Sequence, residues 1–225
     1  MDIQKVMEQL AAWGNEARKK HMKKNGAGEN LFGVPMGNLR KLAETLGRDH
    51  ALALSLWETG NADARMLSAM ILDPAKLERD RAERMIREAG TIDLLDELVF
   101  DAVAEAPYAA ELREAWLTSP DDLEGRVGWT LVISGIQSKQ FKTEALAHYV
   151  DLAEQSLVDA PPLTQWAMNR AMCETAIRYE AFTGRGIEIG ERLGVYKGQK
   201  VPKGCTSAYA PDWIAAGIRL RRPKK

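Results

Sequence analysis

The strongest chemical feature of the sequence is a run of basic residues near its N-terminus. Residues 18–24, Arg-Lys-Lys-His-Met-Lys-Lys, carry five fixed positive charges in seven positions. Such a cluster can contact the phosphates of a polyanion, and we predict this role for Lys19, Lys20 and Lys23. The alternative is structural, because cations at the C-terminal end of a helix interact favourably with its dipole. A second basic group, either a further phosphate contact or a frayed end, comprises Arg219, Arg221, Arg222, Lys224 and Lys225.

The sequence shows no pattern typical of a metal or cofactor site. His21, His50 and His148 do not have the spacing of zinc or iron ligands. Two cysteines, Cys173 and Cys205, cannot form a disulfide framework or a four-cysteine zinc site. The glycine-rich stretch 184–190 has neither the preceding strand nor the spacing of a dinucleotide-binding loop. We therefore expect no metal and no cofactor, and neither phosphoryl transfer nor α/β-hydrolase chemistry.

Charge is distributed unevenly along the chain. Residues 1–42 have eight basic and four acidic residues, a net charge of +4. Residues 43–124 have eight basic and nineteen acidic residues, a net charge of −11. Residues 126–225 have fifteen basic and nine acidic residues, a net charge of +6. A fold that gathers the two basic flanks on one surface would suit a polyanionic partner. Solvated helix faces would produce the same pattern without any partner.

The elements that must position these residues are helices. Apolar residues recur at steps of three and four, first at Ile3, Val6, Met7, Leu10, Trp13 and Ala17, and alternating β-branched runs are absent. Such short helices with tight turns commonly stack as an α-solenoid, although no strict repeat is visible and an irregular helical bundle remains open. We expect helices at about residues 3–17, 36–46, 49–59, 62–72, 74–90, 93–104, 107–117, 121–134, 140–156, 162–182, 186–193 and 209–217.

Length and composition are those of a globular protein. The chain has 225 residues, 45% of them hydrophobic, which is enough for a substantial core. No apolar run is long enough to span a membrane, and the N-terminus does not resemble a secretory signal. We expect a single domain over residues 1–225 whose last ten or so residues form a basic tail. We also expect a cytoplasmic monomer.

Several segments resemble one family in their order and spacing. They are Phe32–Arg40 (Phe-Gly-Val-Pro-Met-Gly-Asn-Leu-Arg), Leu56-Trp57 with Ala64–Met70, Asp93–Asp96, Arg126–Trp129, Gln165–Arg170, and Cys205 with Asp212–Ile214. Over about residues 5–215 they resemble the HEAT-like DNA alkylation repair family, the AlkD-like glycosylases. The resemblance implies an all-α, HEAT-like or ARM-like solenoid of stacked antiparallel helix pairs, with a basic concave face that binds alkylated duplex DNA.

The resemblance also implies hydrolytic release of cationic N3- or N7-alkylpurines. Because such a base is already positively charged, it leaves with little acid catalysis. The enzyme must then stabilise the oxocarbenium-like sugar and position a water molecule, and a carboxylate can do both. Aromatic faces can hold the cationic base or sugar, and an arginine can hold the adjacent phosphate.

Carried over by position, the family's catalytic carboxylate falls on Asp96 and its phosphate-binding arginine on Arg126. The family's two active-site tryptophans fall on Ile92 and Arg170, which are not aromatic. Arg170 is instead a candidate phosphate contact. By helical spacing, Trp129 and Trp166 lie one turn from Arg126 and Arg170, and they are our candidates for the aromatic wall.

Each of these residues also has a structural interpretation. Asp96 lies near the start of a helix, where acids favour the dipole, and Arg126 can pair with acidic residues just before it. Tryptophans most often belong to the core. The retained Asp96 and Arg126 favour a monofunctional DNA N-glycosylase, whereas the missing tryptophans favour a catalytically silent scaffold that binds DNA or a protein. The acidic middle segment leaves a third possibility, a peptide-binding solenoid.

Overall fold

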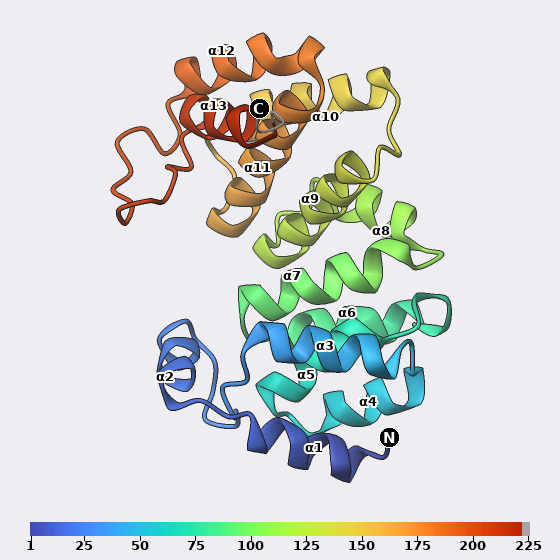
Figure 1. The fold of residues 1–225 in the computed structure, drawn as a ribbon. Helices are drawn as coiled ribbons and strands as arrows, with labels where there is room; N and C mark the ends of the chain where they lie inside the picture. Colours follow the sequence, from blue (N-terminus) through green and yellow to red (C-terminus); the bar gives the residue numbers. More distant parts are fainter. Residues whose placement is uncertain (222–225) are drawn as a thin grey trace. The chain divides into compact units, whose positions relative to one another are not determined.

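A computed structural model describes residues 1–221 of the chain, and within them it contains helices and no strand (Figure 1). The prediction of an all-α protein is therefore confirmed. The helices are α1 (Ile3–Ala12), α2 (Glu16–Lys24), α3 (Met36–Leu46), α4 (His50–Glu58), α5 (Ala62–Ile71), α6 (Arg79–Glu88), α7 (Ile92–Asp101), α8 (Ala109–Trp116), α9 (Asp122–Gln137), α10 (Thr143–Ser156), α11 (Pro162–Arg178), α12 (Thr183–Leu193) and α13 (Ala210–Arg221).

The first predicted helix is two helices in the structure. Asn15 has an extended backbone, and its side chain accepts a hydrogen bond from the Arg18 amide, so it caps α2. A Cβ on Gly14 would lie 2.8 Å from the Phe32 carbonyl oxygen, so only glycine allows the chain to turn this closely against that loop. The basic cluster consequently lies on a short helix of its own.

The chain divides into two compact units, Met1–Ala109 and a second that begins at Ala110. The prediction of one domain over the whole chain stays a prediction. No helix among residues 1–221 is long and apolar enough to cross a lipid bilayer.

The first unit has its core around α4 and α5, with α3 and α7 packed against α5. The pair is joined by a hydrogen bond of 2.7 Å from the Ser68 hydroxyl to the Ala53 carbonyl. Trp57 is fully buried, and its indole nitrogen donates to the Glu88 carboxylate at 2.8 Å. These contacts fix the position of α5 and of the connection from α6 to α7.

The second unit is built around the close pair α9 and α11. A Cβ on Gly125 would lie 2.3 Å from the Thr164 hydroxyl oxygen, and a Cβ on Gly128 would lie 2.7 Å from the Leu117 amide nitrogen. Asp122 accepts hydrogen bonds from the amides of Leu163 and Thr164 at 3.1 and 2.8 Å, so it caps the first turn of α11. The glycines of the Arg126–Trp129 region therefore serve helix packing.

Candidate functional site

The basic cluster lies on α2, and its members have different surroundings. Arg18 donates from Nε to the Val34 carbonyl at 3.2 Å and so holds the following loop. The Lys19 ammonium lies 2.8 Å from the Glu16 carboxylate, and Lys23 forms an ion pair with Glu29. Lys20 is exposed. Because exposed ion pairs of this kind contribute little, a phosphate can compete for Lys19 and Lys23.

The Phe-Gly-Val loop that precedes α3 is anchored by one buried carboxylate. Asp63, in the first turn of α5, has no exposed surface. It accepts hydrogen bonds from the amides of Phe32, Gly33 and Val34 at 2.7, 2.9 and 2.8 Å. Gly33 has a φ of +78°, and a Cβ there would lie 2.7 Å from the Lys19 amide nitrogen. The loop thus fixes α2 against the rest of the first unit.

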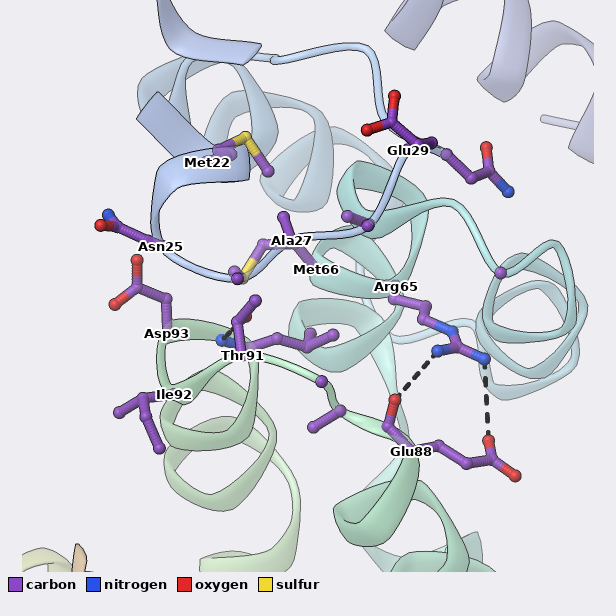
Figure 2. Close-up of a pocket in the computed structure, with 18 of the residues that line it drawn as sticks. Met22, Asn25, Ala27, Glu29, Arg65, Met66, Glu88, Thr91, Ile92 and Asp93 are labelled. Carbon is purple, nitrogen blue, oxygen red and sulfur yellow. Dashed lines mark hydrogen bonds and ion pairs between the residues drawn. The ribbon is translucent and has the colours of Figure 1, made fainter. Parts of the chain in front are cut away.

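A cavity of about 530 Å³ lies between α2, the segment 25–30, the start of α5 and the α6–α7 connection (Figure 2). Met22, Met66 and Ile92 supply apolar lining. On another side, Arg65 donates to the Glu88 carbonyl at 3.0 Å and lies 3.8 Å from the Glu88 carboxylate. The sequence resemblance carries the family's first tryptophan onto Ile92, and the structure places this aliphatic side chain in the lining of the cavity.

The proposed catalytic residue Asp96 lies one turn after Ile92 on α7 and is partly exposed. It is not enclosed in the core. Its role stays a prediction.

A pair of carboxyl groups that the sequence analysis missed follows Asp96 on the same helix. Glu97 and Asp101 are one turn apart and line a cavity of about 470 Å³ with Arg40 and Arg48. Burial, followed by repulsion from Asp101, raises the pKa of Glu97 to about 7, although the Arg40 guanidinium 3.9 Å away opposes the shift. Burial also raises the pKa of Asp101. In the sequence, the signal that could have identified this pair is two acidic residues four positions apart on an amphipathic helix.

This pair should make the stability of the protein depend on pH. The folded state binds the Glu97 proton more tightly than the unfolded chain does, so its contribution is complete below about pH 4.5 and is lost as the pH rises through about 7. We expect Glu97→Gln, which is neutral at every pH, to reduce the loss of unfolding free energy between pH 5 and 8 by about 1 kcal/mol. Urea unfolding at several pH values measures this, and an unchanged profile would contradict it.

In the second unit, two predicted phosphate contacts lie against a predicted aromatic residue. The guanidinium carbons of Arg126 and Arg170 lie 5.0 and 5.5 Å from the centre of the Trp166 ring, within range of cation–π interaction. Arg126 is only 3% exposed, so in this structure it supports Trp166 rather than facing solvent. Arg170 and Trp166 are partly exposed.

Trp129 requires a correction. Its side chain is fully buried and meets the Tyr149 ring edge-on at 6.5 Å, so it is a core residue and not the wall of an open cleft. The helix-spacing argument placed it near Arg126 correctly, but α9 is buried on almost every side. Trp166 remains as the partly exposed candidate for the wall.

The structure thus brings together Arg126, Arg170 and Trp166 in the second unit, whereas Asp96 and the lysines of α2 belong to the first. Among residues 1–221, no group of three or more histidine, cysteine or acidic side chains could hold a metal ion. Of the basic tail, Arg219 and Arg221 lie at the exposed end of α13. Arg222, Lys224 and Lys225 lie outside the described residues.

The chain is similar to one protein family and to two uncharacterised bacterial proteins. The model of the DNA alkylation repair enzyme family matches residues 6–201. The uncharacterised protein Lin0241 of Listeria innocua is 25% identical over 83% of this chain and 81% of its own. The uncharacterised protein Lmo0209 of Listeria monocytogenes is 24% identical over 87% of this chain and 86% of its own.

One solved structure resembles the whole chain. It has a TM-score of 0.85 and 26% identity, and the match covers 99% of this chain and 96% of the other. That structure is described as "a new family of proteins related to the HEAT-like repeat DNA glycosylases with affinity for branched DNA structures". The predicted HEAT-like fold is therefore confirmed.

Proposed function

Since the chain belongs to the DNA alkylation repair enzyme family, we propose that it binds DNA and prefers branched DNA to a linear duplex. The observation that carries this proposal is the full-length likeness to a structure related to the HEAT-like repeat DNA glycosylases with affinity for branched DNA. Lys19, Lys20, Lys23 and Arg170 contact phosphates. The protein acts as a cytoplasmic monomer without metal or cofactor.

The charges of the described residues support this proposal. The lysines of α2 are exposed or held only by surface ion pairs, and Arg170 is partly exposed. Such groups bind phosphate oxygens without reading base sequence. A branched DNA brings phosphates of several strands close together, and basic residues spread over a helical-repeat protein can meet more of them than on one straight duplex.

The proposal is tested by comparing dissociation constants for a four-way junction and for a linear duplex of equal length and composition. We expect the junction to bind about 10-fold more tightly, which corresponds to the additional phosphate contacts. Equal affinity would remove the preference for branches, and the absence of binding to either DNA would overturn the proposal.

A second candidate function is hydrolytic release of a cationic N3- or N7-alkylpurine. The observation in its favour is Asp96, partly exposed and one turn from the cavity residue Ile92. A carboxylate there would stabilise a sugar cation. The missing aromatic residues at Ile92 and Arg170 and the burial of Trp129 favour DNA binding without chemistry.

If the chain excises bases, Asp96→Asn should lower release of methylated purines by about 100-fold, because one strong electrostatic contact is lost. The affinity for DNA should stay unchanged or rise slightly, because the substitution removes a negative charge that faces a polyanion. Release of free base from methylated duplex measures the effect. Asp80→Asn, which removes an exposed carboxylate of the same unit outside this cavity, is the matched control. No release by the unaltered protein would establish the silent scaffold.

A further inference from the structure

The second unit contains a pair of tryptophans that no part of the proposed function uses together. Trp166 on α11 and Trp213 on α13 have ring centres 5.8 Å apart and planes tilted by 53°. Both are partly exposed. They line a cavity of about 400 Å³ together with Gln199, Val201, Thr206 and Ala208. We call it the Trp166–Trp213 cavity, and its lining has apolar and amide groups but no carboxylate.

The segment that closes this cavity is basic. Residues 194–209 connect α12 to α13 and form the long loop coloured orange to red in Figure 1. The loop contains Lys197, Lys200 and Lys203, all exposed, and no acidic residue. On its other side the cavity adjoins Trp166, with the guanidinium groups of Arg126 and Arg170 within 5.5 Å of the ring centre. Positive charge therefore lies near both aromatic rings of the cavity.

The loop is held in place rather than merely exposed. It begins at Gly194, whose φ of +67° ends α12. Near its other end, the Asn169 side chain donates to the Ala208 carbonyl at 2.8 Å, and the Ala208 amide donates to the Gln199 side chain at 2.9 Å. The lining residues Gln199 and Ala208 are thereby tied to each other and to α11, so the cavity has a defined wall.

We propose that the Trp166–Trp213 cavity binds an unpaired nucleobase of DNA. The base stacks on the Trp213 ring and contacts the tilted Trp166 ring beside it, and Lys197, Lys200 and Lys203 contact the phosphates of the same strand. An aromatic surface with nearby cations and no carboxylate suits a neutral flat ring carried on an anionic backbone. A cationic ligand finds no opposite charge in the lining. The inference rests on the proposed function, since branched DNA offers unpaired bases at its junctions.

The test separates base contacts from phosphate contacts. Two labelled strands of about 12 nucleotides are compared, one of thymidines and one made only of abasic sugars with the same phosphates. We expect the unaltered protein to bind the thymidine strand about 10-fold more tightly than the abasic strand, as for one stacked base. Trp213→Ala should abolish this ratio, and Trp213→Phe should restore part of it. Trp13→Ala, which removes a partly exposed tryptophan of the first unit, should leave it unchanged.

Removing charge from the loop should have a different signature. The variant Lys197→Gln/Lys200→Gln/Lys203→Gln should weaken binding to both strands equally. It should also reduce the magnitude of the slope of log affinity against log salt concentration by about 2. The control Lys41→Gln/Lys139→Gln/Lys142→Gln removes the same charge from other exposed positions. If the Trp213→Ala variant does not fold, the site is tested by NMR of the unaltered protein. Two indole N–H resonances should shift when the thymidine strand is added and should not shift with the abasic strand.

The outcomes are distinct. Equal affinity of the unaltered protein for the two strands, or an unchanged ratio in folded Trp213→Ala, would overturn the nucleobase site and leave binding to branched DNA standing. Absence of binding to strands, junction and duplex alike would overturn the proposed function and the nucleobase site with it.

Discussion

Replacing Asp63 with alanine should lower the free energy of unfolding by about 3–5 kcal/mol, a large part of the stability of a typical domain. The carboxylate is fully buried and accepts the amides of Phe32, Gly33 and Val34, all within 2.9 Å. Its loss leaves three donors in or next to the core without an acceptor, each at a cost of about 1–3 kcal/mol before relaxation.

Chemical unfolding in urea measures this change. Asp63→Asn keeps one side-chain oxygen and the side-chain volume, so it should lower the free energy of unfolding less than Asp63→Ala does. Glu44→Ala, an exposed acid of the same unit, is the control and should change stability by less than about 0.5 kcal/mol. A loss from Asp63→Ala as small as that of the control would refute the role of this carboxylate as the anchor of the loop.

The variant Lys19→Gln/Lys20→Gln/Lys23→Gln should weaken binding to branched DNA by about 10-fold or more at low salt. These lysines extend from α2, whose position is fixed by the loop that Asp63 anchors. Since Lys19 and Lys23 are paired only with partly or fully exposed acids, their replacement should change stability little. Gel-shift or anisotropy titration measures the affinity.

The matched control is again Lys41→Gln/Lys139→Gln/Lys142→Gln, which removes three charges elsewhere. Equal loss in the two variants would indicate a general effect of net charge rather than a site on α2. A loss confined to the α2 variant supports the proposed contacts.

The helical class was predictable because periodicity and caps are local. Asp121 accepts from the amides of Leu123 and Glu124, and Thr91 accepts from Leu94, as expected of residues placed just before a helix. The division between α1 and α2 was missed although its cap, Asn15, is a local signal, because the apolar spacing continues to Ala17. The contact of Gly14 with Phe32, which fixes the turn, joins segments that are not adjacent in the sequence.

The site was less predictable because its residues are brought together by contacts between segments that are far apart in the sequence. A helical face shows which residues share a side, but α9 is buried on nearly all sides, so spacing alone could not separate the core residue Trp129 from a cleft residue. Likewise, Asp63 reads as an acid in the first turn of a helix, and only tertiary structure shows that it binds a loop thirty residues earlier. Trp213 lay in a recognised segment, yet its partner Trp166 is distant in the chain.

Binding of branched DNA through phosphate contacts is most directly tested by the salt dependence of affinity. The four contacts from Lys19, Lys20, Lys23 and Arg170 alone contribute about −3 to −4 to the slope of log affinity against log salt concentration. The triple lysine variant of α2 should reduce the magnitude of the slope by about 3. A steep slope for the unaltered protein, reduced in this variant, is the expected result. A flat dependence, or a slope that the variant leaves unchanged, would contradict the account.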